Sequence, residues 1–113
     1  MWDIFDEGVE WELDPAALAL PDFPPASHGP DGIREFFRRL VGAFEEWDYE
    51  AEELIGAQDA VVVRIHHWGR GKGSGAPVEA RFWQVWIMRD GKAVRVTHHI
   101  EKADALEAAC PTE

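Results

Sequence analysis

Apolar residues recur at spacings of three and four between residues 31 and 47, and charged residues fill most of the positions between them. This spacing places the apolar side chains on one face of a helix, because an α-helix completes a turn in 3.6 residues. Asp31 is of a residue type that caps helix starts. The pattern predicts a helix from Asp31 to about Trp47 with an apolar stripe of Ile33, Phe36, Phe37, Leu40, Val41, Phe44 and Trp47.

Four later segments are rich in β-branched and aromatic residues, and we predict strands over 49–56, 60–68, 77–89 and 92–100. "RDGK" at 89–92 separates two of them and predicts a hairpin turn, since Gly91 tolerates positive φ. A short helix is expected over 102–109. At the N-terminus we expect a helical turn, a break at Gly8 and a short strand over 9–13. Residues 14–30 hold five prolines and are expected to be mostly loop.

One long helix beside a meandering antiparallel sheet predicts an α+β domain. Successive strand residues face opposite sides of a sheet, so we assign the even positions of the last two strands to the side that faces the helix. That side carries Phe82, Gln84, Trp86, Val94, Val96, His98 and Ile100. The outer side carries Trp83, Val85 and Ile87, more apolar surface than a lone domain usually leaves in water. We therefore expect a homodimer through the sheet.

Composition and charge narrow the class of protein. The chain has 113 residues, which predicts a single domain over 1–113, and a formal net charge of −11, which disfavours nucleic acid as a partner. Its one cysteine, Cys110, excludes an intrachain disulfide. No apolar run reaches the length of about 18 residues that indicates a membrane span. The acidic N-terminus lacks the basic start of a signal peptide, so a cytoplasmic location is expected.

The stretch "RIHHWGRGKGSG" at 64–75 raises the question of a phosphate or metal site. It lacks the order of a phosphate-binding loop, and the residues after it predict a strand rather than a helix. His66 and His67 are adjacent on a strand, as are His98 and His99, so one histidine of each pair can face inward. No spacing in the chain supplies the three protein ligands of a zinc site. We expect a hairpin loop here, and neither a metal nor a cofactor.

Three segments together resemble a known family: "HGPDGIREFFRRL" (28–40), "GRGKGSGAPVEARFWQVWIMRDGKAVRV" (69–96) and "ADALEAA" (103–109). In order and spacing they resemble the SnoaL-like branch of the nuclear transport factor 2-like superfamily, over about residues 5–109. The resemblance implies a cone-shaped fold, in which a curved antiparallel sheet wraps around helices and a pocket opens at the wide end. It also implies that the helix with which the family usually begins is missing here.

The resemblance also implies where functional side chains would stand. The general-base aspartate of ketosteroid isomerases would fall on Trp11, and their proton-donating acid on Gln84, so isomerase chemistry is not expected. The SnoaL-like cyclases use an aspartate helped by a histidine. His98 is then the best candidate acid or base, although we find no inward carboxylate to pair with it.

From these features we predict a protein that binds an apolar small molecule. Trp11, Phe82, Trp86 and Val96 would form the pocket walls, with Gln84 and His98 as the polar, candidate catalytic groups. A second hypothesis is an enzyme of the same fold that transfers protons or adds water to an apolar carbonyl compound, as cyclases, isomerases and hydratases do. A third is an interaction module that uses the outer face of the sheet.

Overall fold

The structure is a computed structural model and describes residues 2–13 and 25–109. The elements, in chain order, are the 3-10 helix η1 (Trp2–Ile4), strands β1 (Phe5–Glu12) and β2 (Ala26–His28), helix α1 (Gly29–Gly42), strands β3 (Phe44–Ala57), β4 (Ala60–Gly71), β5 (Pro77–Arg89) and β6 (Lys92–His99), and helix α2 (Lys102–Ala109). None of the helices in these ranges is long and apolar enough to cross a membrane.

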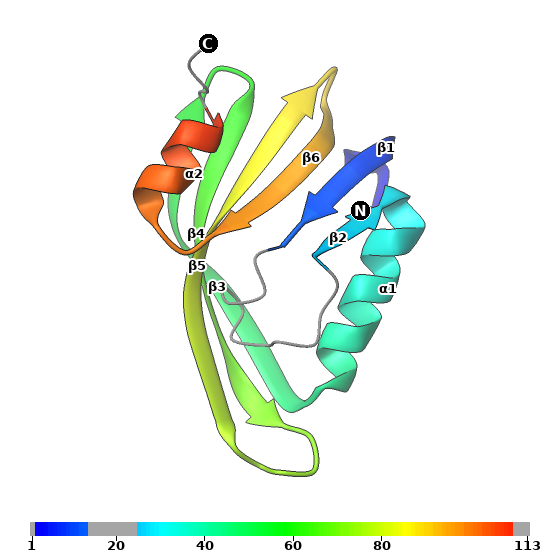
Figure 1. Cartoon of the computed structure of the whole chain (residues 1–113), viewed down its shortest axis with the longest axis vertical. Coiled ribbons are helices and arrows are strands. Elements are labelled where there is room, and N and C mark those ends of the chain that lie inside the picture. The colour runs from blue at the N-terminus through cyan, green and yellow to red at the C-terminus, as the bar shows by residue number, and fades with distance from the viewer. Residues whose placement is uncertain (1, 14–24, 110–113) are drawn as a thin grey trace.

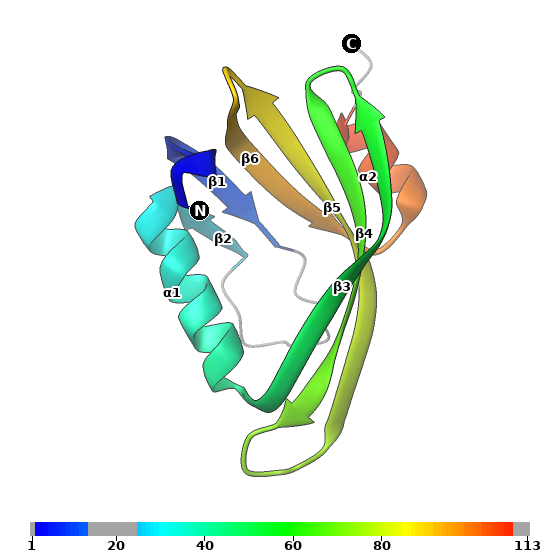
Figure 2. The same ribbon diagram turned by 180° about the vertical axis from the view of Figure 1, so that it is seen from behind.

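The six strands form one open sheet in the order β2-β1-β6-β5-β4-β3. It is curved, with α1 on its concave side and α2 against the opposite face (Figures 1 and 2). The α+β cone predicted from the sequence is confirmed. The sheet is mixed rather than wholly antiparallel, because β1 runs parallel to its neighbour β6.

Each face of the sheet has its own apolar core. On the concave side, α1 contributes Ile33, Phe36 and Leu40 to a cluster that also holds Val9 and Phe82. On the opposite side, α2 packs over a second, smaller cluster formed by Ala60, Val62, Trp83, Val85 and Ala105. The outer strip that the sequence assigned to a second chain is therefore largely covered by the last helix of the same chain.

Helix α1 ends earlier than the apolar spacing predicts. It begins at Gly29, with Pro30 in its first turn, and ends at Gly42 rather than near Trp47. The backbone N–H of Ala43 closes the last turn on the carbonyl groups of Arg39 and Leu40. The chain then becomes extended, because Phe44 and Trp47 pair with β4 as part of β3. Their spacing of three fits a helix, yet tertiary strand pairing decides their conformation.

The N-terminal third also differs from expectation. Gly8 does not end a helical turn but lies inside β1, where the pairing with β6 shifts register between Phe5 and Glu10. In the segment expected to be loop, residues 26–28 form β2 and residues 29–30 begin α1. The rest of that segment, residues 14–24, lies outside the described residues.

The assignment of strand faces by parity holds along β5 but fails at both ends of β6. A bulge lies between the pair Ile87–Arg95 and the pair Met88–Ala93. It turns Ala93, fully buried, toward the concave core and leaves Val94 out of that core. Ile100 follows the end of β6 and is 46% exposed. Between these positions, Val96 and His98 are buried.

Both predicted hairpins are present. At the tip between β5 and β6, Asp90 and Gly91 have φ values of 51° and 80°, a pair of positive values that the tight turn requires. The glycine-rich stretch forms the tip between β4 and β5, with a strand on each side (Figure 1). No helix starts there, so the loop has no helix N-terminus that could hold a phosphate.

Gly69 allows β3 and β4 to approach closely, and we expect Gly69→Ala to destabilise the protein by about 2 kcal/mol. A Cβ at this position would collide with the backbone carbonyl oxygen of Glu46 and lie 3.0 Å from Phe44 Cδ1. Gly56→Ala is the matched control, since a Cβ there meets no atom within 4 Å. Urea unfolding of both variants checks the prediction, and an equal loss of stability in the two would contradict it.

Candidate functional site

A cavity of about 530 Å³ lies on the concave side of the sheet, between α1 and the strands. This volume is within the range of pockets that hold small molecules. Aromatic and aliphatic side chains form most of its wall, and none of the lining residues is an aspartate, glutamate, lysine or arginine. The lining residues are Ile4, Phe5, Trp11, Phe36, Phe37, Leu40, Trp47, Tyr49, Ile65, His67, Phe82, Gln84, Trp86 and His98.

Two other hollows, of about 710 and 700 Å³, lie at the far end of the β4, β5 and β6 strands. Both are more open than the concave cavity. Asp59 and Arg89 line both of them. Neither brings aromatic rings or histidines together. The concave cavity is therefore the better candidate site.

A chain of hydrogen bonds crosses the cavity wall from β5 to β1. Trp86 Nε1–H donates to Gln84 Oε1 over 3.1 Å, and Gln84 Nε2 lies 3.2 Å from His98 Nε2. His98 Nδ1 lies 2.8 Å from the backbone carbonyl oxygen of Glu12. A carbonyl oxygen can only accept, so His98 carries its proton on Nδ1 and receives the Gln84 amide hydrogen at Nε2. Every donor in this chain faces an acceptor.

Burial keeps the His98 imidazole neutral. The side chain is 4% exposed, and loss of water around it lowers its pKa to about 4, against the opposing effect of the hydrogen bond to Glu12. At neutral pH, Nε2 of His98 is therefore unprotonated and engaged by Gln84.

A second histidine, His67, also lines the cavity. It is 1% exposed, and Trp47 Nε1–H donates to its Nδ1 over 3.0 Å. The acceptor role of Nδ1 places the imidazole hydrogen on Nε2, the opposite tautomer from that of His98. Sequence reasoning stated that one histidine of the His66–His67 pair could face inward, but it did not place His67 in the pocket. His67 lies two residues after Ile65 on the same strand, so the two side chains share a face of the sheet, and this alternation could have placed His67 there.

The structure brings together five of the six residues that the sequence assigned to the pocket. Trp11, Phe82, Gln84, Trp86 and His98 all line the cavity. Val96 is not among the lining residues. It pairs with Trp11 on one neighbouring strand and with Trp86 on the other, and it is fully buried in the core. The larger indole rings on either side form the wall in its place.

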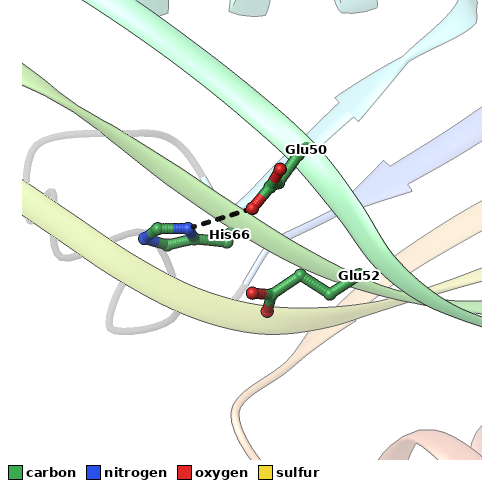
Figure 3. A group of neighbouring side chains, drawn as sticks. All are labelled: Glu50, Glu52 and His66. Atoms are coloured by element: carbon green, nitrogen blue, oxygen red, sulfur yellow. Dashed lines mark ion pairs between the residues drawn. The ribbon is translucent and has the colours of Figure 1, made fainter.

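Outside the cavity, His66 and two carboxylates gather on the outer face of the sheet (Figure 3). Ligand atoms of Glu50, Glu52 and His66 lie within 4.8 Å of one another. Glu52 is already paired with Arg64 and Arg81, at 3.6 and 3.1 Å, and His66 Nε2 lies 2.7 Å from Glu79. Since neighbouring cations and a carboxylate already engage these groups, we assign no metal here.

Comparison with known proteins agrees with this geometry. A family model for the SnoaL-like domain matches residues 1–96. No curated protein matches the sequence significantly. The solved structures of similar fold include the following three. A protein from Burkholderia thailandensis described as NTF2-like is 24% identical, with a TM-score of 0.76 over 94% of this chain and 82% of that one.

The second is TerC, co-crystallised with polyporic acid, which is 24% identical with a TM-score of 0.69 over 92% of this chain and 78% of that one. The third, from a Jannaschia species, is described as a candidate SnoaL-like polyketide cyclase. It is 18% identical, with a TM-score of 0.72 over 98% of this chain and 78% of that one. At these identities, the similarity concerns the fold alone.

Proposed function

This chain belongs to the SnoaL-like domain family, and from that premise we propose that it binds an apolar small molecule in the cavity between α1 and the sheet. The observation that carries the proposal is the lining itself, in which converging aromatic rings surround a few fixed polar groups. The co-crystallisation of TerC, a protein of the same fold, with a small organic molecule supports it.

The geometry favours binding over proton transfer. A general base needs a free lone pair, and the one on His98 Nε2 already accepts from Gln84. No carboxylate from the described part of the chain lines the cavity to assist it. Proton transfer on an apolar carbonyl compound stays the second candidate, favoured by the candidate cyclase among the structural neighbours. It would require His98 to release Gln84 and to titrate near neutrality.

The binding proposal is tested at the rim of the cavity. Tyr49 lines the cavity and is 56% exposed, so a charge can be placed there without disturbing the core. We expect Tyr49→Glu to weaken binding of the uncharged, polarity-sensitive dye Nile red by about tenfold, because a carboxylate at an apolar mouth must lose water when a ligand enters. Fluorescence titration measures the dissociation constant.

Leu54→Glu is the matched control. Leu54 lies on the same strand, is 68% exposed and does not line the cavity. If the two variants weaken Nile red binding equally, the dye binds elsewhere and the proposal loses its support. Wild-type protein that fails to bind the dye at all would contradict it directly.

A further inference from the structure

One buried hydrogen-bond donor in the cavity wall has no acceptor within residues 2–13 and 25–109. Trp11 is 2% exposed and lines the cavity, and its Nε1–H has no hydrogen-bond partner among the described residues. Folded proteins satisfy about nine in ten of their buried polar groups, because an unpaired donor has lost water without replacement. Neighbouring groups cover the Nε1 atom itself, so an acceptor in the cavity would satisfy this donor once the adjoining rings shift.

The neighbouring donors are already committed to acceptors of the protein. Trp86 donates to Gln84, and Gln84 in turn donates to His98. Trp47 donates to His67 on the other side of the cavity. Of the tryptophans that line the cavity, Trp11 is thus the one whose indole N–H has no such contact within the described chain.

The charge of the wall limits what can enter. No aspartate, glutamate, lysine or arginine lines the cavity, and His98, one of its two histidines, is neutral at physiological pH. An ionised ligand would leave water without meeting a charge of opposite sign. The rings around Trp11 favour a flat ligand, since His98 lies 4.8 Å from its ring centre and Phe36 and Phe37 each lie 5.5 Å away.

We propose that Trp11 Nε1–H donates a hydrogen bond to an acceptor oxygen of an uncharged, ring-containing ligand, and that Trp11 thereby determines which ligands the cavity accepts. This inference rests on the proposed binding function and adds to it the ligand's charge, its acceptor group and the residue that recognises that group.

Three naphthalene probes of similar shape test the inference. 2-Acetylnaphthalene carries a ketone oxygen, 2-ethylnaphthalene lacks it, and 2-naphthoate carries a negative charge. We expect the ketone to bind wild-type protein about tenfold more tightly than the hydrocarbon, as one hydrogen bond contributes, and the carboxylate to bind more weakly than either. In Trp11→Phe, which keeps an aromatic ring but loses the N–H, the ketone and the hydrocarbon should bind alike.

If Trp11→Phe does not fold, a measurement on wild-type protein can test the inference instead. In a ¹H–¹⁵N spectrum, the ketone should shift the indole N–H signal of Trp11 downfield, and the hydrocarbon should not. Tightest binding of 2-naphthoate, or a ketone preference that persists in Trp11→Phe, would overturn the inference while leaving the binding function in place. Failure of all three probes and of Nile red would overturn the proposed function, and the inference with it.

Discussion

Replacing Trp83 by alanine is expected to lower the free energy of unfolding by about 3–5 kcal/mol, the range for deletion of a buried tryptophan. Trp83 is 7% exposed and belongs to the core between α2 and the outer face of the sheet. The Lys102 ammonium, from the first residue of α2, lies 5.4 Å from the centre of its ring. Without the indole, α2 would lose the largest side chain of the cluster on which it packs.

Trp68→Ala is the control, because it removes the same side chain from the same face of the sheet. Trp68 is 36% exposed, and its ring lies tilted against that of His66, with ring centres 4.7 Å apart. We expect this variant to lose less than about 1 kcal/mol. Urea unfolding measures both values, and the difference between the two variants isolates the contribution of the α2 core.

The Trp83→Ala variant also bears on the homodimer predicted from the sequence. If the outer strip binds a second chain, sedimentation should show that wild-type protein is dimeric and that Trp83→Ala is monomeric with its fold intact. If the strip is instead the surface on which α2 packs, Trp83→Ala should unfold at a lower urea concentration than wild-type protein. This result should not depend on whether wild-type protein is a monomer or a dimer. The first result would contradict our view of Trp83.

Strand alternation predicted much of the site, because a period of two fixes which residues share a face. It placed Phe82, Gln84 and Trp86 together on β5 and added His98 from the next strand. It failed at Val94, where a bulge inserts one extra residue and reverses the alternation. Bulges depend on how two distant segments pair, so the local sequence of one strand does not reveal them.

Two other differences also arise from long-range packing. Phe44 and Trp47 continue the helical spacing of α1 but pair with Gly71 and Gly69 of β4, and only the partner strand makes this conformation preferable. The sequence predicts a helix over 102–109 but not that it packs on the outer apolar strip, and the homodimer through this strip stays a prediction. The local sequence was enough to predict this segment as a helix, but not to predict which face of the sheet the helix packs against.

His98 should make the stability of the protein depend on pH in a defined window. In the unfolded chain its pKa is near 6.5, whereas burial lowers it to about 4 in the folded protein. Between these values the unfolded state binds a proton that the folded state does not, so the free energy of unfolding falls as pH falls. We expect a loss of about 3 kcal/mol from pH 7 to pH 4, and less than about 1 kcal/mol more from His98 at lower pH.

Urea unfolding of wild-type protein and His98→Gln across this range measures the effect. Glutamine keeps an amide donor for the Glu12 carbonyl and an acceptor for Gln84, but it does not titrate. Since the carboxylates are common to both proteins, the difference between their two pH profiles isolates His98.

The outcome also decides between binding and proton transfer. An imidazole with a pKa of about 4 is a weak base at neutral pH, whereas acid–base catalysis is most effective when the pKa lies near the working pH. A histidine-detected NMR titration reports the pKa of His98 directly. A value near neutrality, together with parallel pH profiles for wild-type protein and His98→Gln, would contradict the neutral, Gln84-bound imidazole and favour the enzymatic alternative. A low value leaves His98 the role of holding Gln84 in place at the wall of a binding pocket.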